Sequence, residues 1–412
     1  MKNILLPCLF FLLAFGSLFS SLYAQENNSS NWLQFRGNER SGISAETGIT
    51  KDWSVKAPQL LWKTEIGSGF SEIVLLNNKI YTMESDSIDP QTGSEYISAY
   101  EMETGKLIWK TKVDSIFIDI DGWGNGPRST PVIDNNTAFC LSSFGKFTAV
   151  SINDGKILWQ KNFLTEYEST TPRWGFSSSP LVLGENVVIE VGGTNSRTLA
   201  AFNKTSGELV WAKANGAADY GSPILAEING QKQIIYANSK TLYSFNDKGD
   251  TLWTFKMPIQ RTPTAAPIFI APDKIFVSTL GTVGFVVIKV ENNRPKEILQ
   301  GTNIKNDFSS SCYYNGHIYG FNTAVLQCNS AETGATLWVK RGYGKGSLIL
   351  VDGQLIVLSD QGKLIFVEAT PEKYNEIGNI QAIDGKSWTA PSFGNGKVFV
   401  RNLTQMACYK LK

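Results

Sequence analysis

Eight short stretches of the 412-residue chain combine glycine, serine or threonine with charged and aromatic side chains. Small residues of this kind are typical of turns, which would hold the larger side chains at the ends of regular elements. Arginine binds carboxylates in a bidentate geometry, lysine binds them as a point charge, and tryptophan offers a flat apolar face. If the stretches meet in space, they predict a site for an anionic ligand such as a sugar acid. They are residues 67–72, 121–130, 172–179, 218–222, 259–264, 305–311, 342–347 and 385–389.

These stretches supply the candidate ligand-binding residues, which are Glu72, Arg128, Arg173, Trp174, Tyr220, Arg261, Asp307, Lys345 and Trp388. A sugar ring would stack on Trp123 or Trp174. Asp307, Asn306 or Glu72 would offer oxygen ligands to Ca²⁺, although no spacing here is specific for that ion. Asp307 and Asp219 are the candidate catalytic carboxylates, and the sequence does not choose between them. The structural alternative is that the hydroxyls cap strand ends and each arginine pairs with an acid of a neighbouring repeat.

Other site chemistries have little support in the sequence. His317 is the single histidine and no C-x-x-C pair is present, which argues against a zinc site. Cys140, Cys328 and Cys408 lie in strand-like runs, so we expect them to be buried as small apolar residues. The acidic segment 114–122 lacks the order of a calcium loop and is interpreted as a solvated crossing between repeats.

A repeat supplies the elements that would position the eight stretches. Glycine stands four residues before tryptophan five times, at Trp109, Trp159, Trp211, Trp253 and Trp338. These tryptophans are 50, 52, 42 and 85 residues apart, and the last gap is about two repeats. A period of this length indicates a repeat architecture.

One repeat, residues 126–161, divides into four strand-like runs separated by the turns "NN", Gly145 and "NDG". Four antiparallel strands per repeat, arranged radially, form a propeller blade. The same pattern recurs, with changed loops, at 70–112, 175–213, 219–256, 262–300, 307–340 and 345–381. The fold predicted is all-β and consists of four-stranded antiparallel blades.

The chain ends predict an eighth blade. Residues 57–67 contain a lone fourth strand with Trp62, and the last 26 residues contain three strands. Pairing of the two ends would give an eight-bladed β-propeller over residues 59–412, with no long open sheet edge. Within each blade we expect the glycine to turn the chain from the third to the fourth strand and the tryptophan to pack against a neighbouring blade. Two repeats have Leu299 and Ile377 near the tryptophan position; the structural tryptophans are Trp62, Trp109, Trp159, Trp211, Trp253 and Trp338.

The pattern A-x-x-x-x-T-G-x-x-x-W resembles the tryptophan-docking repeat of PQQ (pyrroloquinoline quinone) propellers. Residues 99–109, "AYEMETGKLIW", match it with Glu101 where aspartate is usual, and 149–159 and 328–338 match with substitutions. The opening 31–44, "NWLQFRGNERSGIS", also resembles the leader of secreted bacterial PQQ-like repeat proteins. The resemblance covers nearly the whole chain after its first residues.

The resemblance implies two kinds of activity. Quinoprotein dehydrogenases hold PQQ and Ca²⁺ in the central funnel, use an aspartate as base and usually carry a ring of two adjacent cysteines. Scaffolds such as the outer-membrane assembly lipoprotein of the Bam complex have no catalytic role. This chain lacks adjacent cysteines and long insertions, and it also lacks a convincing lipobox.

Three hypotheses follow for the function. The first is an exported propeller that binds PQQ or another anionic or sugar ligand in its central channel. The second is a PQQ-dependent dehydrogenase of sugars or alcohols, with PQQ and Ca²⁺ as cofactors. The third is an envelope scaffold whose partner is another envelope protein.

The N-terminus predicts export. Lys2 precedes an apolar run from Ile4 to Phe15 and a small-residue region, as in a signal peptide ending near Ala24. Residues 25–58 would then form a leader segment before the propeller, and the location would be periplasmic or secreted. Residues 1–24 contain one lysine and no acid, so removing them changes the net charge from +1 to zero. This balance gives no indication of a nucleic-acid partner, and no further stretch is apolar enough for a transmembrane span.

Overall fold

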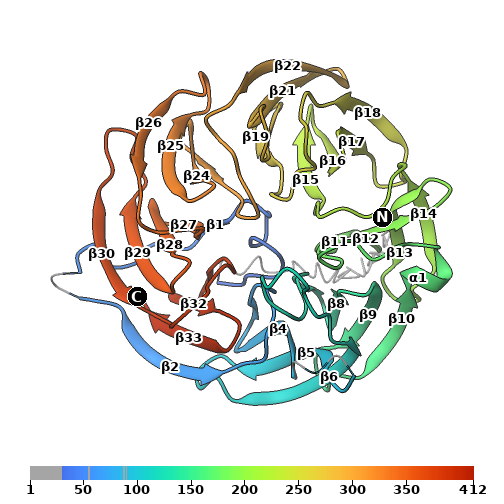
Figure 1. The fold of residues 1–412 in the computed structure, drawn as a ribbon, viewed down its shortest axis with the longest axis horizontal. Coiled ribbons are helices and arrows are strands. Elements are labelled where there is room, and N and C mark those ends of the chain that lie inside the picture. The colour runs from blue at the N-terminus through green and yellow to red at the C-terminus, as the bar shows by residue number, and fades with distance from the viewer. Residues whose placement is uncertain (1–29, 54–55, 87–88, 90) are drawn as a thin grey trace, which may run out of the picture.

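The computed structural model describes residues 30–53, 56–86, 89 and 91–412, and the predicted signal peptide lies outside these residues. Eight sheets surround a central axis, as predicted (Figure 1). In each blade the first strand lies nearest the axis and the fourth lies on the outer wall. The described residues contain a single short helix, α1 (Phe163–Glu166).

The blades follow one another along the chain. In blades 1 to 7 the four blade strands are in sequence order from the axis outward, whereas the outer strand of blade 8 is the N-terminal β2. Blade 1 consists of β3 (Val74–Leu76), β4 (Lys79–Ser85), β5 (Ser94–Glu101) and β6 (Leu107–Ser115). Blade 2 consists of β7 (Val132–Asp134), β8 (Thr137–Leu141), β9 (Lys146–Ser151) and β10 (Ile157–Asn162). Blade 3 consists of β11 (Leu181–Leu183), β12 (Asn186–Gly193), β13 (Arg197–Asn203) and β14 (Leu209–Lys213), and blade 4 of β15 (Ile224–Ile228), β16 (Gln231–Asn238), β17 (Thr241–Phe245) and β18 (Thr251–Lys256).

Blade 5 consists of β19 (Ile268–Ile270), β20 (Lys274–Ser278), β21 (Phe285–Glu291) and β22 (Arg294–Gly301). Blade 6 consists of β23 (Cys312–Tyr314), β24 (His317–Asn322), β25 (Val325–Ser330) and β26 (Thr336–Lys340). Blade 7 consists of β27 (Ser347–Val351), β28 (Gln354–Leu358), β29 (Lys363–Glu368) and β30 (Glu376–Gln381). Blade 8 consists of β31 (Ser392–Gly394), β32 (Lys397–Arg401), β33 (Gln405–Lys410) and β2 (Gln59–Glu65). Residues from adjacent sheets share apolar clusters; Val74 and Tyr81 of blade 1, for example, pack with Ile133 and Val150 of blade 2.

Blade 8 is split between the two ends of the chain, which confirms the predicted closure. Strand β2 pairs antiparallel with β33, and Trp62 lies opposite Cys408. The N-terminal strand thus supplies the outer strand that the C-terminal strands lack (Figure 1).

Five of the six structural tryptophans donate to the third-to-fourth-strand turn of the next blade. The indole of Trp159 in blade 2 donates to the Lys204 carbonyl of blade 3 at 3.1 Å. Gly207, in the same turn, has φ +71°, and a Cβ placed there would lie 2.7 Å from Cδ2 of Trp159. The glycine is therefore needed twice, for its left-handed backbone and for the space that the indole occupies. Trp62, Trp109, Trp211 and Trp338 donate to blade 1, 2, 4 and 7 carbonyls in the same way.

Three joints differ from this pattern. Between blades 7 and 8, Gly378 of β30 lies opposite Phe366, next to Ile377, and a Cβ there would lie 2.3 Å from Cε3 of Trp53 of the leader. Trp253 donates to Oε1 of Gln233 within its own blade at 2.9 Å, because blade 5 lacks the glycine turn. Between blades 5 and 6 the tryptophan is replaced, as expected, by Leu299, whose Cδ2 lies 3.5 Å from the position of a Cβ on Gly334. An apolar contact is thus retained there without an indole.

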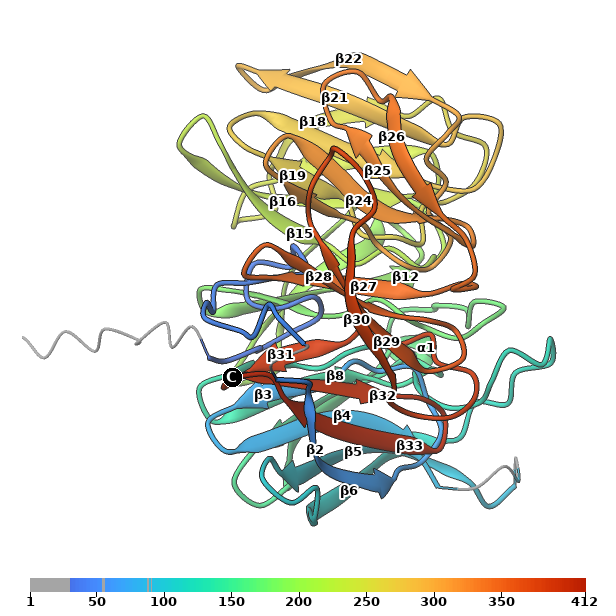
Figure 2. The same ribbon diagram turned by 90° about the vertical axis from the view of Figure 1, so that its left-hand side faces the viewer.

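The leader lies across the central channel, an arrangement that the sequence did not predict. Trp32 exchanges two backbone hydrogen bonds with Leu75 of blade 1, and β1 (Ile43–Ser44) pairs in parallel with β27 of blade 7. Between these points the fully buried Arg40 donates to the carbonyls of Ser179 and Pro180 at 3.0 and 2.5 Å, and to that of Pro223. The segment lies on one face of the disc (blue in Figure 2) and connects blades that are far apart around the ring.

Candidate functional site

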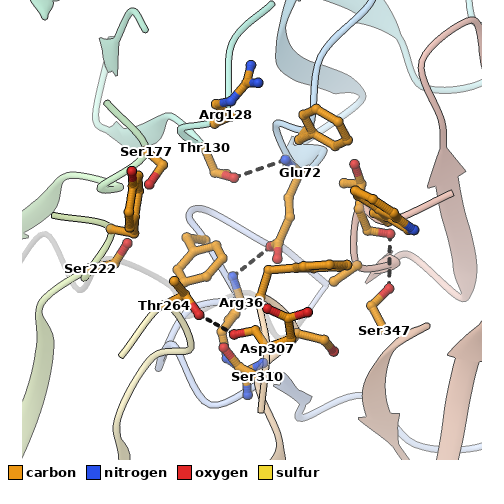
Figure 3. Close-up of a pocket in the computed structure, with 18 of the residues that line it drawn as sticks. Arg36, Glu72, Arg128, Thr130, Ser177, Ser222, Thr264, Asp307, Ser310 and Ser347 are labelled. Carbon is orange, nitrogen blue, oxygen red and sulfur yellow. Dashed lines mark hydrogen bonds between the residues drawn. The ribbon is translucent and has the colours of Figure 1, made fainter. Parts of the chain in front are cut away.

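A cavity of about 300 Å³ occupies the central channel where the blade-to-blade connections meet the first strands. The eight stretches identified in the sequence all lie in these connections, and each supplies at least one residue of the lining. Six of them supply charged or large apolar side chains. The other two, 218–222 and 259–264, supply Tyr220, Ser222 and Thr264. Phe35 and Arg36 of the leader complete the lining. The leader therefore forms the floor of the cavity, and the connections form its walls and mouth (Figure 3).

Four aromatic rings form one wall. Trp388 lies at the centre of this group, with ring centroids 4.8 Å from Phe308, 5.5 Å from Trp123 and 6.1 Å from Phe70. A second group, Trp174 and Tyr220, has its centroids 5.3 Å apart. Flat apolar faces of this kind can stack on a ring-shaped ligand.

A lysine–aspartate pair lies against the aromatic wall. Nζ of Lys345 is 2.7 Å from Oδ2 of Asp307, and it lies 5.5 to 5.9 Å from the ring centroids of Trp123, Phe308 and Trp388. The side chain of Lys345 is about one-third exposed. It therefore retains donor capacity toward a ligand while the rings restrict where that ligand can lie.

Arg128 lines the cavity, but its guanidinium already has partners in the protein. It donates to the carbonyls of Gly124, at 2.8 Å, and Gly126, and Nη2 lies 3.9 Å from Oδ1 of Asp119. Its carbon Cζ lies over the ring of Phe117 at 4.7 Å. Burial lowers the pKa of Arg128, and the nearby Asp119 carboxylate opposes that shift. Little of this side chain is available for a bidentate contact with a ligand.

Glu72 is a buried carboxyl group at the floor. Its Oε2 accepts a hydrogen bond from the backbone N–H of Arg36 at 2.8 Å, and its own N–H donates to Oγ1 of Thr130 at 2.9 Å (Figure 3). Burial raises the pKa of Glu72 to about 7, although the hydrogen bond from Arg36 and the charges of Arg36 and Arg40 oppose the shift. Near neutral pH this carboxyl is therefore present in both protonation states.

Many hydroxyls line the cavity, and several of them connect adjacent blades. Oγ of Ser222 accepts from the backbone of Ser179 at 2.9 Å, and Oγ of Ser310 accepts from Ala266 at 2.9 Å. Oγ of Ser347 donates to the Thr389 carbonyl at 3.2 Å. The structural alternative foreseen for the serines and threonines therefore describes these contacts.

Seven of the nine predicted side chains line this cavity, namely Glu72, Arg128, Trp174, Tyr220, Asp307, Lys345 and Trp388. Arg173 lies outside it, at the rim, and forms a bidentate pair with Asp121. Arg261 is exposed and does not line the cavity. Neither arginine can contribute to a cation cluster within it, because the loops that carry them direct them elsewhere.

The other candidates from the sequence have structural partners. Asp219 accepts hydrogen bonds from the backbone of Ser239 at 2.9 Å and from Oγ1 of Thr262 at 3.2 Å. The buried Asn306 donates to Ser311 and Phe321. Within residues 30–53, 56–86, 89 and 91–412, no three His, Cys, Asp or Glu side chains form a group that could hold a metal ion.

Sequence reasoning missed Phe35, Arg36, Phe70 and Phe308 as parts of the site. Phe308 stands beside Asp307 in a stretch that had been singled out, so its position was a usable signal. Phe35 and Arg36 come from the leader, and only the path of that segment through the channel brings them to the floor.

The fold defines a PQQ-like repeat propeller with a cavity in its central channel. The family model described as outer membrane protein assembly factor BamB matches residues 93–340, which is more than half of the chain. The chain therefore belongs to this family of PQQ-like propellers. In the part of the chain that the structure describes, no helix is long and apolar enough to cross a membrane.

Individual proteins that resemble this chain share little sequence identity with it. The quinoprotein alcohol dehydrogenase PedH of Pseudomonas putida is 29% identical over 135 residues, which cover 30% of this chain and 21% of that protein. The match thus spans about a fifth of the length of this curated relative. BamB from Moraxella catarrhalis superposes with a TM-score of 0.63 at 13% identity, covering 86% of this chain and 98% of BamB. The quinohemoprotein alcohol dehydrogenase ADHIIG from Pseudomonas putida HK5 superposes with a TM-score of 0.68 at 12% identity, covering 93% and 80%. These two likenesses show the fold alone.

Proposed function

We propose that the chain is an exported binding protein whose central cavity holds one sugar ring that carries a single negative charge. The observation that carries this proposal is the Lys345–Asp307 pair set against the aromatic wall. Aromatic faces stack on a sugar ring, the carboxylate accepts from its hydroxyls, and the ammonium donates to its carboxylate. A cavity of about 300 Å³ is at the small end of ligand sites and suits one ring.

The charges of the cavity support a ligand with one negative charge. Arg36, Arg128 and Lys345 are cationic, while Asp307 and Glu72 are acidic. Because burial raises the pKa of Glu72 to about 7, this set has an excess of between one and two positive charges near neutral pH. Part of this excess is already used by backbone carbonyls around Arg36 and Arg128.

PQQ with Ca²⁺ fits these residues poorly. PQQ carries three carboxylates, but two of the four cationic candidates from the sequence, Arg173 and Arg261, lie outside the cavity. The guanidinium of Arg128 is bound to Gly124 and Gly126. For Ca²⁺, the described residues offer no cluster of three acidic, His or Cys side chains. The aromatic wall is the one feature that would suit the planar quinone.

The experiment is calorimetric titration of the chain without residues 1–24. D-galacturonate and D-galactose test the proposal, and PQQ with Ca²⁺ tests the dehydrogenase alternative, which the similarity to PedH favours. We expect galacturonate to bind at least 10-fold more tightly than galactose. Tight PQQ binding with dye-linked oxidation of an alcohol or sugar would overturn the proposal.

Two variants test the geometry. Trp388→Ala should weaken galacturonate binding about 10-fold through lost stacking, whereas Trp388→Phe should retain most of it. Lys345→Met should remove the preference for the acid over the neutral sugar. Lys248→Met, on an exposed hairpin turn of blade 4, is the matched control and should leave both affinities unchanged.

The family model supports a scaffold as the other candidate function. An envelope scaffold would bind a protein partner, and its sugar titrations would be flat. Affinity capture from envelope extract that recovers one partner in equal amount, from a protein that binds no sugar, would favour this alternative.

A further inference from the structure

Residues 117–126, here called the rim loop, join β6 to β7 and lie at the mouth of the cavity. The loop is folded on itself. The Gly126 N–H donates to the Phe117 carbonyl at 2.9 Å, and the Asp119 N–H donates to Oδ1 of Asn125 at 3.0 Å. Oδ2 of Asp119 in turn accepts from the N–H groups of Trp123 and Gly124. These internal bonds would let the loop move as one unit.

The tip of the rim loop is held on one side by the connection before β11. Arg173 forms two hydrogen bonds with Asp121, Nε to Oδ2 at 2.8 Å and Nη2 to Oδ1 at 2.7 Å. Nε1 of Trp174 donates to the same Oδ2 at 2.7 Å. These donors, Arg173 first, lower the pKa of Asp121 to about 2. The carboxylate therefore stays charged at neutral and mildly acidic pH.

On the other side the tip is held by the connection before β31. Nζ of Lys386 donates to the carbonyls of Trp123 at 2.9 Å and Gly122 at 3.2 Å. The same ammonium lies 4.8 Å from the ring centroid of Trp388. The loop tip is thus fixed to connections on both sides of the mouth.

Trp123 is the part of the rim loop that reaches the ligand cavity. Its ring lies 5.5 Å from that of Trp388 and forms part of the cavity lining, yet 42% of the residue is exposed. Trp123 therefore separates the cavity from solvent, and the conformation of the rim loop determines the position of its ring.

We propose that Asp121, Arg173 and Lys386 are positioning residues that hold Trp123 as the movable outer wall of the cavity. As far as the ligand is concerned, this inference rests on the function proposed above. Opening the wall requires the loss of the contacts at Asp121 and Lys386, while the bonds within the rim loop persist. Near the base of the loop, Arg128 and Ser68 also donate to the carbonyls of Gly124 and Asn125, both at 2.8 Å. Because exposed ion pairs contribute little to global stability, the effect of losing them should be local.

The first experiment needs no ligand. Hydrogen exchange is measured over peptides covering 117–126 in the wild type, in Asp121→Ala and in Lys386→Met. We expect exchange there to rise about 10-fold in each variant, with the blade strands and the melting temperature unchanged. Asp154→Asn, which removes an exposed pair with Lys156 on a hairpin of blade 2, is the control and should leave the rim loop unaffected. Unchanged exchange in Asp121→Ala would overturn the inference.

The second experiment follows dissociation of D-galacturonate by stopped-flow tryptophan fluorescence. Asp121→Ala should raise the dissociation rate about 10-fold, and it should add nothing in a Trp123→Ala background, because the residue acts through that ring. Equal effects in both backgrounds would show that Asp121 acts by another route and would overturn the proposal. If the wild type binds no galacturonate, the sugar proposal fails, and the exchange experiment alone decides the role of the loop.

Discussion

Replacing Gly207 by alanine should destabilise the propeller far more than the same change at Gly184. Both glycines lie in blade 3 and both have positive φ, +71° and +58°. A Cβ on Gly207 would lie 2.7 Å from Cδ2 of Trp159, whereas a Cβ on Gly184 would have nothing within 4 Å. The left-handed backbone costs alanine about 1 kcal/mol at either site. At Gly207 the displaced indole adds about 1–3 kcal/mol of overpacking.

Calorimetry can measure this difference. For a chain of this length about 1 kcal/mol corresponds to about 1 °C in melting temperature. We therefore expect a decrease of about 1 °C for Gly184→Ala and about 2–4 °C for Gly207→Ala. In a Trp159→Leu background the cost of Gly207→Ala should fall to that of Gly184→Ala, since leucine already faces the glycine at the joint between blades 5 and 6. Equal decreases at the two glycines, or no coupling to Trp159, would refute the idea that the glycine is needed for the indole.

Three further predictions concern buried groups. Arg40→Met should cost about 3–5 kcal/mol, because it leaves three buried carbonyls without their donor; a calorimetric loss no larger than that of the exposed control Arg261→Met would contradict this. Burial raises the pKa of Glu190 to about 8, so the folded state holds a proton that the unfolded state releases above about pH 4.5. Wild-type stability should therefore fall between about pH 5 and 8 relative to Glu190→Gln, and a melting-temperature difference that stays flat over this range would show the assignment to be wrong. The four cysteines of the described residues are free and buried. In the protein without residues 1–24, a thiol reagent should therefore react with none of them in the native state and with four after unfolding. Fewer than four reactive thiols after unfolding would indicate a disulfide.

Much of the fold could be predicted because short sequence patterns mark its turns and strands. The Gly-x-x-x-Trp spacing marks one turn and one strand in five of the eight blades, and the lone strand around Trp62 indicates how the ring closes. Leu299 could be assigned to its place because the apolar character is retained where the turn is lost. Most of these features depend on residues close in sequence, so the sequence of one chain reveals them.

The leader and the fine structure of the site were not predictable in the same way. Arg36 and Arg40 look like ordinary charged residues of a polar segment, and only their path through the channel gives them carbonyl partners on distant blades. Arg173 was expected beside the ligand, but its guanidinium instead pairs with the carboxylate of Asp121 on the neighbouring loop. Long side chains on loops can point in several directions, so sequence identifies the right loop more easily than the right side chain.

The pairing of β2 with β33 has a consequence for the order in which the molecule is made. Trp62 and Cys408 are 346 positions apart, so the outer strand of blade 8 has no partner until the last residues have been synthesised. Seven blades can assemble from hairpins between sequence neighbours, whereas this final ladder requires closure of almost the entire chain, which is slow. A chain truncated before residue 405 would therefore lack β33 and leave β2 and the outer edge of β32 without their partner, and such bare strand edges favour aggregation.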